Sequence, residues 1–372
     1  MPKKTIDAPL LTDRALNRAT LMRQGLLTRQ PVSVMAMLEQ LIGLQGQVHK
    51  APYVGLWSRL TSFAIPDLEV LLKDRRAVRA TVMRCTLHVV TAEDFLAIRP
   101  LIDPIAWRGF KTNHLKPLKG ADVDEVRAAS RALLDVETLS PAALGARLQE
   151  RWPETEAVPL SMAARFLEPV VHVPPAGLFG ATRAPELTSA RRWLGRDPDL
   201  SLSLDALVLR YLRAFGPASG HDFGAWSGLT GGPAAMERLR PQLLSFVGED
   251  GRELFDLPEA PRPGPDIEAP VRLLPDYDNV VVGYDDRSRM LRPEHFKGLS
   301  MANGMRPGFT VDGFVRGTWK LKIGKDGASI AFFWFDRVTS KARAELTREA
   351  RALLKTLAPD ATHDISFEAF AG

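Results

Sequence analysis

The same order of elements is predicted three times along this 372-residue chain, and this order constrains the fold more than any other feature. In each of three successive segments, several helix-forming stretches are followed by a pair of short β-like runs. Helices followed by a hairpin are typical of the winged helix, a helix-turn-helix variant. We name these parts the first segment (1–120), the second segment (121–200) and the third segment (201–265).

The individual elements are predicted from capping residues and apolar spacing, because no exact sequence repeat is present. For the first segment we predict helices over 14–24, 34–42, 53–60 and 67–73, β-like runs over 77–83 and 86–91, and a helix from 93 toward 100. For the second we predict helices over 122–136, from 140 onward and over 161–167, then a strand over 170–173 that returns at 178–179. For the third we predict helices over 205–215, 219–229 and 234–244, and a hairpin over 246–257.

The C-terminal segment (266–372) has a different character and follows a proline-rich linker. Short strand-like runs separated by Gly and Asp turns predict a small β-barrel or curled sheet, closed by a helix over 340–357. The runs cover 271–274, 280–282, 309–311, 314–315, 318–323 and 330–334. We therefore expect an α+β fold of three tandem winged-helix units followed by a C-terminal β-barrel-like domain.

Composition excludes several other classes of protein. Hydrophobic residues make up 45% and charged residues 25%, which is an ordinary globular composition. No run approaches the roughly 18 apolar residues of a membrane span, and residues 1–10 lack the apolar core of a signal peptide. The single cysteine, Cys85, cannot form an internal disulfide. We expect a soluble cytoplasmic protein, associated with the nucleoid if DNA is its partner.

The distribution of charge points to that partner. The net charge is only +5, but the first segment carries 18 Lys and Arg against 9 Asp and Glu, a net +9. The remaining segments carry −3, −2 and +1 in chain order. Such asymmetry indicates a binding partner, with nucleic acid as the leading candidate and a solvated basic surface as the alternative.

One polar pair stands out in the first segment. Gln45 and Gln47 follow an apolar helix that is expected to end near Gly43. Side chains two residues apart project to the same side of an extended backbone. Each amide offers donors and an acceptor, so the pair could hold one water molecule or grip a nucleic-acid backbone. The alternative is a polar turn between helices.

The usual catalytic motifs are absent from the sequence. It contains no P-loop, no dinucleotide-binding glycine motif and no H-E-x-x-H zinc motif. A G-x-S-x-G nucleophile elbow is also absent, and the seven histidines show no metal-ligand spacing. We expect neither a metal nor a cofactor.

The motif Gly43-Leu-Gln45-Gly-Gln47 resembles the glutamine-x-glutamine motif of the AlkZ-like DNA glycosylases, within the AlkZ/YcaQ-like family. The resemblance spans about residues 12–357. Further stretches that resemble the family are 84–90, 192–195, 274–279, 283–289, 311–313 and 317–319. The YcaQ type has aspartate where this chain has Gln47, so the chain groups with the AlkZ type. Gly46 lies in the middle, where the family usually has a bulkier residue.

This resemblance implies a monofunctional DNA glycosylase acting on double-stranded DNA that carries alkylated purines, including bulky adducts or interstrand crosslinks. It implies Gln45 and Gln47 as the catalytic residues. Alkylation makes the purine a cationic leaving group, so two amide oxygens that position water could suffice without a strong base. No catalytic lysine for a lyase step stands out. We expect a monomer. A regulator is less natural, because regulators usually read two half-sites through a dimer.

Other residues are candidates for DNA contacts. Phosphate contacts are predicted for His49, Lys50, Arg75, Arg76, Arg79 and Arg84. The alternatives are a solvated loop histidine and a charged surface turn. The aspartates of 276–286 are interpreted as turn residues and partners in internal salt bridges. A non-catalytic winged-helix regulator and a protein-binding module remain the alternative functions.

Overall fold

The computed structural model describes residues 8–301, 304–325 and 327–370 and shows a mixed α+β fold. Residues 1–7, part of the stretch considered above for a signal peptide, lie outside the described residues. Within the described ranges, no helix combines the length and the apolar character needed to cross a bilayer.

The first segment folds largely as its caps predict. Its elements are β1 (Leu10–Leu11), α1 (Asp13–Arg23), α2 (Val34–Leu41), β2 (Leu44–Gln45), α3 (Ala51–Arg59), α4 (Ile65–Lys73), β3 (Ala77–Thr81), the 3-10 turn η1 (Met83–Cys85), β4 (Leu87–Thr91), α5 (Ala92–Asn113) and the 3-10 turn η2 (Lys116–Leu118). The Thr12 and Ser33 side chains accept hydrogen bonds from the backbone N–H groups of Ala15 and Ala36. These bonds satisfy free donors at the starts of α1 and α2.

Helix α5 corrects one expectation, because it continues through Pro100 and Pro104 instead of ending there. Pro100 has no N–H to donate to the carbonyl of Leu96 one turn earlier. The backbone N–H of Asp199 donates to that carbonyl at 3.2 Å instead. A donor from a distant part of the chain thus compensates for the proline.

The second segment contains the three predicted helices and a different hairpin. Its elements are α6 (Val123–Val136), α7 (Pro141–Gln149), α8 (Ala157–Leu167), β5 (Val170–Val173), β6 (Glu186–Ser189) and α9 (Ala190–Leu194). The predicted return strand at 178–179 is wrong, since β5 pairs with β6. Phe179 instead packs its ring edge against Tyr53 of α3, with centroids 5.3 Å apart. Because Phe179 packs against the first segment, residues 178–179 do not form the second strand of the hairpin.

One sheet joins the first and second segments. Its strand order is β2-β4-β3-β5-β6, and all of its pairs are antiparallel. Across the junction, Arg79 of β3 lies opposite His172 of β5, and Ala80 lies opposite Val171. Strand β4 separates this junction from β2, which carries Gln45, but the Arg79 side chain reaches across to the Gly46 carbonyl.

The third segment matches its prediction closely. Its elements are α10 (Leu204–Phe215), α11 (Gly220–Ser227), α12 (Gly232–Leu239), the 3-10 turn η3 (Arg240–Gln242), β7 (Leu244–Gly248) and β8 (Glu253–Asp256). Strand β1 adds to this hairpin in parallel to β7. A buried cluster joins this segment to the first, with Tyr211 and Trp226 packed in one core with Val78 and Phe95.

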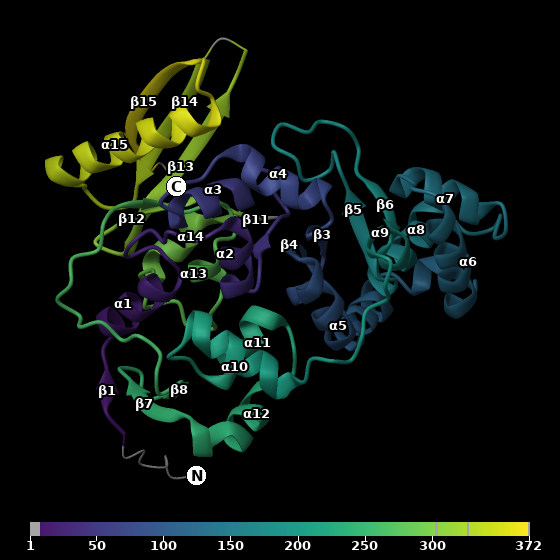
Figure 1. Cartoon of the computed structure of the whole chain (residues 1–372), viewed down its shortest axis with the longest axis horizontal. Coiled ribbons are helices and arrows are strands. Elements are labelled where there is room, and N and C mark those ends of the chain that lie inside the picture. Colours follow the sequence, from purple (N-terminus) through teal and green to yellow (C-terminus); the bar gives the residue numbers. More distant parts are fainter. Residues whose placement is uncertain (1–7, 302–303, 326, 371–372) are drawn as a thin grey trace.

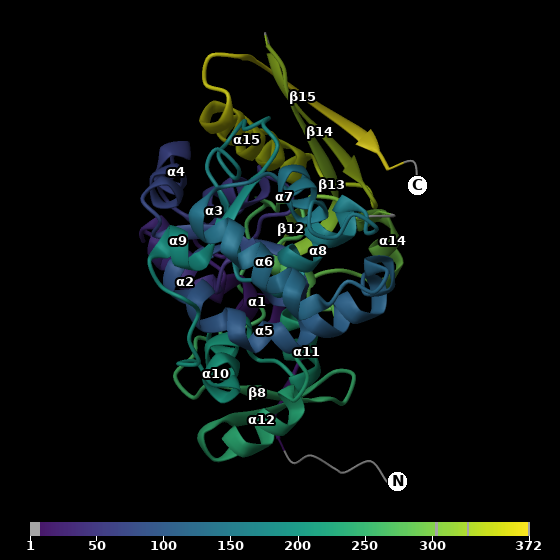
Figure 2. The same cartoon turned by 90° about the vertical axis from the view of Figure 1, so that its right-hand side faces the viewer.

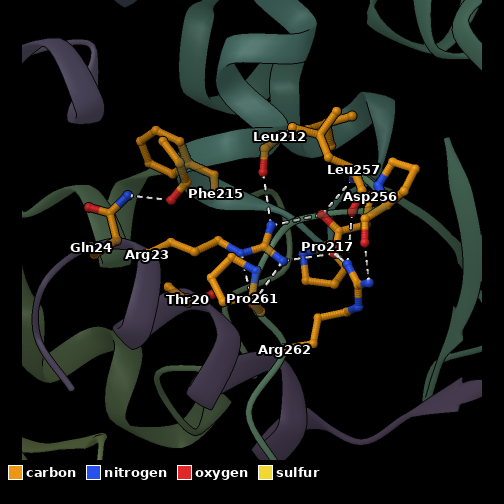
Figure 3. A network of polar contacts seen from close by, with 12 residues as sticks. Thr20, Arg23, Gln24, Leu212, Phe215, Pro217, Asp256, Leu257, Pro261 and Arg262 are labelled. Carbon is orange, nitrogen blue, oxygen red and sulfur yellow. Dashed lines mark hydrogen bonds and ion pairs between the residues drawn. The ribbon is translucent and has the colours of Figure 1, made fainter. Parts of the chain in front are cut away.

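A buried ion pair also fixes α1 against the third segment (Figure 3). Arg23 of α1 donates to both carboxylate oxygens of Asp256 at 2.8 Å, and Asp256 is fully buried. Arg23 also donates to the carbonyl of Leu212 on α10, and Arg262 donates to Asp256 from the linker. The third segment and α1 therefore form one packed body.

The C-terminal segment forms an open sheet. Its elements are β9 (Arg272–Leu273), α13 (Asn279–Val282), the 3-10 turn η4 (Pro293–His295), α14 (Phe296–Leu299), β10 (Ser300–Met301), β11 (Gly304–Met305), β12 (Gly308–Val311), β13 (Phe314–Ile323), β14 (Gly327–Trp334), α15 (Ser340–Leu357) and β15 (Thr362–Ala369). The predicted β-barrel is wrong for the described residues. In the strand order β15-β14-β13-β12-β9, the edge strands β15 and β9 do not pair with each other, so the sheet is open. Helix α15 buries Leu346 and Leu353 against Ile330 and Phe332 of the sheet. Because α15 covers the apolar face of the sheet, that face is buried although the sheet does not close into a barrel.

Two further details of this segment differ from expectation. The run 280–282 is helical and not a strand, because the Asp278 side chain accepts a hydrogen bond from the Val280 N–H and caps α13. The closing helix is followed by β15, which pairs in parallel with β14. The turn residue Asp278 therefore outweighs the β propensity of three valines.

Figure 1 shows how the parts are arranged. The first segment is central, the second lies at the right of the view, the third lies below, and the C-terminal sheet lies at the upper left. Figure 2, with the second segment toward the viewer, shows α15 lying along the sheet formed by β13, β14 and β15. Hydrogen bonds connect the stretch 43–46 to the other three parts: Asn279 bonds to Gly43, Arg79 bonds to both Gly46 and His172, and Arg84 bonds to both Gln45 and Trp226.

Candidate active site

The glutamine motif begins directly after α2, which ends at a left-handed turn. Ile42 and Gly43 both adopt left-handed backbone conformations, with φ of 56° and 93°. A Cβ at position 43 would lie 2.4 Å from Cγ1 of Val90, so only glycine fits there. The chain leaves this turn as β2, which pairs with β4.

Backbone hydrogen bonds hold the motif in place. Gln45 lies opposite His88 of β4, and the Gly46 N–H donates to the Leu87 carbonyl at 2.7 Å. Nε of Arg79 donates to the Gly46 carbonyl at 2.9 Å. Both polar groups of Gly46 are therefore bonded, and the glycine is fixed although it has no side chain.

Arg84 orients the amide of Gln45. Its guanidinium donates to Oε1 of Gln45 at 2.8 Å and also to the carbonyl of Trp226, at the end of α11. Arg84 reaches inward from a turn in which Arg84 and Cys85 both have φ of 55°. The Gln45 side chain is nearly buried, at 6% exposure, and its Nε2 has no partner among the described residues.

Gln47 is exposed, in contrast to Gln45. Its Oε1 lies 3.5 Å from the Leu87 N–H, at the limit of hydrogen bonding. The oxygens of both glutamines thus face donors from the same turn, residues 84–87. That the two amides act together stays a prediction.

His88, which lies opposite Gln45 on β4, is a neutral group. It is 1% exposed, and its Nδ1 is 3.0 Å from the Thr86 carbonyl. Burial, together with the nearby Arg84, lowers the pKa of His88 to about 3. Because a carbonyl only accepts, Nδ1 carries the proton and Nε2 is an acceptor.

The next two predicted contacts lie at the start of α3. His49 is half-buried, and its Nδ1 has no hydrogen-bond partner in the described part of the chain. Burial, reinforced by Arg79, lowers the pKa of His49. Lys50 occupies the N-cap position and places its Nζ 5.7 Å from the Phe179 ring centroid.

Arg75, Arg76 and Arg79 do not share one environment, since Arg79 lies within β3. Arg75 and Arg76 are exposed, and Arg75 stacks on Trp193 with 4.5 Å between its Cζ and the ring centroid. Arg79 is 4% exposed and donates to Nδ1 of His172 at 2.9 Å. Only Arg75 and Arg76 lie on the open surface as a phosphate contact requires.

Sequence reasoning missed the second segment's contribution. His172 and Arg165 lie near Arg79, and burial together with Arg79 lowers the pKa of His172 to about 3. The contact depends on the pairing of β3 with β5, for which the sequence gives no local signal. Trp226 was missed for the same reason, since it reaches the site from the third segment.

The aspartates of 276–286 separate into two kinds. Asp278 pairs with Arg59 at 2.7 Å, and both side chains are fully buried. Asp285 and Asp286 pair with Arg252, so the interpretation as internal salt bridges is confirmed for these three. Asp276 forms no ion pair with any described residue, and burial raises its pKa. No three His, Cys, Asp or Glu side chains in the described ranges are grouped to hold a metal ion.

Comparisons with known proteins show the family of this chain. A family model described as "DNA glycosylase AlkZ-like" matches residues 38–356. A curated relative from Streptomyces sahachiroi, the "Interstrand DNA cross-link repair glycosylase", is 25% identical over 329 residues, covering 80% of this chain and 85% of the relative. The solved structure of the Streptomyces sahachiroi DNA glycosylase AlkZ superposes with a TM-score of 0.78 at 21% identity, covering 95% of this chain and 99% of that one. The chain therefore belongs to the AlkZ-like family of DNA glycosylases.

Proposed function

We propose that this protein hydrolyses the N-glycosidic bond of N-alkylated purines in double-stranded DNA, with Gln45 and Gln47 as its catalytic residues. One observation carries the proposal: both amides of the family's motif meet the turn 84–87, and Gln45 is oriented there by Arg84. The Streptomyces sahachiroi relative is described as a crosslink repair enzyme. We extend the proposed substrates to bulky adducts and interstrand crosslinks on that basis.

The chemistry needs positioning more than a strong base. An alkylated purine is cationic and leaves readily as the sugar approaches an oxocarbenium-like state. Arg84 occupies one lone pair of the Gln45 oxygen, which leaves the other lone pair and both Nε2 protons for a water molecule. Gln47 supplies a second amide beside it, so the pair holds the attacking water in place.

The basic residues divide into two roles under this proposal. His49, Lys50, Arg75 and Arg76 are proposed to contact phosphates, because none of them is buried. Arg79 and Arg84 are proposed to position the motif, since they bond to Gly46 and Gln45. Phosphate contacts by the latter two stay a prediction from the sequence.

We further propose that the first three segments are winged-helix units and that 1–120, 121–200, 201–265 and 266–372 act as domains. The paired strands after the helices of each segment support this. We also propose a monomer that works on chromosomal DNA in the cytoplasm. A monofunctional enzyme would leave the DNA strand intact at the abasic site.

A single-lesion duplex tests the reaction. The protein is incubated with a duplex carrying one 7-methylguanine, and free base and abasic sites are measured. Release of the base with an uncut strand supports a monofunctional glycosylase. Salt-dependent binding without release from methylated and bulky lesions alike would contradict the proposal and favour a non-catalytic DNA-binding protein.

Gln45→Ala and Gln47→Ala test the site. We expect each variant to release the base about 100- to 1,000-fold more slowly, the effect of removing one preorganised hydrogen-bonding group, while binding to the duplex is retained. Gln149→Ala, which removes a hydrogen-bonded glutamine of α7 in the second segment, is the matched control. Normal release by both motif variants would remove these residues from the mechanism.

A further inference from the structure

Four basic side chains from the first and second segments lie together beside the glutamine motif. We call them the basic cluster: His49 before α3, Arg79 of β3, Arg165 of α8 and His172 of β5. Arg79 donates to the Gly46 carbonyl and to Nδ1 of His172, both at 2.9 Å. His49 and Arg165 are close enough for their charges to act on His172, and Arg165 also acts on Arg79. The cluster is therefore attached to the middle residue of the motif.

The charge of the cluster is not balanced within the described ranges. Neither Arg79 nor Arg165 forms an ion pair there. Burial and Arg165 lower the pKa of Arg79 to about 10, and burial lowers the pKa of Arg165, with no acidic group acting against either effect. Buried charges in proteins are normally paired. A guanidinium that is only 4% exposed and has no counter-charge therefore indicates that an anion completes the site.

Acidic residues of the neighbouring helices are engaged elsewhere. Glu168, three residues after Arg165 in the chain, binds Arg127 and Arg131. Glu69 of α4 pairs with Lys73. Neither carboxylate is free to neutralise the cluster.

The cluster presents hydrogen-bond donors to that anion. A guanidinium has five N–H groups and no acceptor, and Arg79 uses two of them for Gly46 and His172. Because Arg79 can only donate to Nδ1 of His172, the neutral ring carries its proton on Nε2, which has no partner among the described residues. The guanidinium of Arg165 contacts only the sulfur of Met162, at 3.4 Å, in the described part of the chain. A phosphodiester carries a negative charge and only accepts, so it matches these donors.

The cluster opens to solvent next to the catalytic amides. Arg79 and His172 are nearly buried, whereas His49 and Arg165 are half-buried and form the outer side. His49 follows the exposed Gln47 by two residues. An anion bound at the outer side would therefore lie close to the stretch of chain that carries the motif.

We propose that the basic cluster binds one backbone phosphate of the DNA strand that carries the lesion, next to the damaged nucleotide, and that Arg165 of the second segment contacts this phosphate. The proposal rests on the proposed function and adds to it the point at which the strand is fixed. Arg79 bonds to Gly46, so a phosphate held by the cluster would fix the sugar of the damaged nucleotide relative to both amides. The second segment then takes part in positioning the substrate.

The test removes the charge of one phosphate at a time. Duplexes carry a tetrahydrofuran analogue of the abasic site, so that binding is measured without base release. A neutral methylphosphonate replaces single phosphates next to the analogue, in either strand. Dissociation constants are measured for the wild type, for Arg165→Met and for Arg147→Met, which removes an exposed arginine of α7 in the same segment.

We expect one methylphosphonate in the lesion strand to weaken wild-type binding about tenfold or more, the effect of losing a hydrogen bond between charged groups. Arg165→Met weakens binding of the unmodified duplex by a similar factor and loses nothing further at that linkage. His49→Gln gives the same pattern and serves as the second variant should Arg165→Met fold poorly. Arg147→Met keeps the wild-type response at every linkage. A methylphosphonate effect as large in Arg165→Met as in the wild type at every linkage, or a coupling confined to the opposite strand, would overturn the proposal.

Base release separates this proposal from the proposed function. With a 7-methylguanine duplex, we expect Arg165→Met to raise the enzyme concentration at half-maximal release about tenfold. Failure of the wild type to release the base, with the phosphate coupling present, would defeat the proposed function and leave the phosphate site in place. Normal release without any coupling to Arg165 would defeat the phosphate site alone.

Discussion

Gln45 and Gln47 are two residues apart, yet the protein surrounds them differently. Gln45 is buried against a charged guanidinium, whereas Gln47 is exposed beside a backbone N–H at 3.5 Å. An amide with one oxygen lone pair occupied has fewer orientations available, so less entropy is lost when it binds water. Gln45 is the preorganised member of the pair, and Arg84 is the residue that preorganises it.

Arg84→Met tests this positioning role. Loss of a hydrogen bond to a charged group costs about 1.5–3 kcal/mol, so we expect the maximal release rate to fall about tenfold to a hundredfold. DNA affinity and its salt dependence stay near the wild-type values. Arg84→Lys restores part of the rate, because lysine can still donate to Oε1 of Gln45.

Arg76→Met is the matched control for Arg84, since it removes an exposed arginine of the same segment. We expect it to weaken DNA binding while the maximal rate is kept. Arg84 would instead be a phosphate contact if Arg84→Met weakened binding and lowered the salt dependence as Arg76→Met does.

Two buried histidines predict how stability depends on pH. The pKa values of His88 and His172 are about 3 in the folded protein and near 6.5 in the unfolded chain. The unfolded state therefore binds more protons, and the free energy of unfolding falls as pH drops below about 6.5. At pH 5 we expect each histidine to cost about 2 kcal/mol relative to pH 7.5.

Urea unfolding between pH 7.5 and 5 measures this loss. Few carboxylates titrate in that window, so the histidines dominate the slope. His172→Asn should remove somewhat less than half of the pH dependence, because the lowered pKa of His49 adds to the same slope. A free energy of unfolding that is independent of pH over this range would show that both histidines protonate normally in the folded protein.

At the scale of elements, capping residues could be predicted and long-range partners could not. Thr12 and Ser33 start α1 and α2 because a cap acts within three residues of itself. The predicted end of α5 at Pro100 is wrong because the backbone N–H of Asp199, far away in the chain, donates to the Leu96 carbonyl that Pro100 cannot reach. The candidate site divides in the same way. Local spacing singles out Gln45 and Gln47 and the family resemblance assigns them a role, whereas the contact of His172 depends on the pairing of β3 with β5.

The loop 274–279 is an element whose stability can be tested. Asp278 caps α13 and pairs with Arg59 of α3, and both side chains are fully buried. Removing one partner of a buried pair leaves an uncompensated charge, so we expect Asp278→Ala to lower the free energy of unfolding by about 3–5 kcal/mol. Asp285→Ala, which breaks an exposed pair, should cost less than about 1 kcal/mol.

Chemical denaturation of the two variants at neutral pH gives both values. Because Asn279 bonds the same loop to Gly43, we also expect Asp278→Ala to slow base release. Similar stability of the two aspartate variants would mean that the loop is held by packing and not by the ion pair.

At the scale of the whole molecule, charge and architecture coincide. The basic first segment is central, and the other three parts surround it (Figure 1). The motif and the exposed Arg75 and Arg76 all belong to this segment. DNA bound by its phosphates against the first segment would therefore bring a damaged base toward the amides.

Salt dependence of binding tests where the DNA lies. Each phosphate contact adds about 0.9 to the slope of log affinity against log salt, so Arg75→Ala with Arg76→Ala should lower the slope by about two. The matched control is Arg147→Ala with Arg238→Ala, which removes the same charge from exposed, ion-paired arginines of the second and third segments. An equal decrease of the slope in both double variants would show that net charge alone attracts the DNA. A loss confined to the first pair requires the phosphates to lie against the first segment, where Gln45 and Gln47 can reach the base.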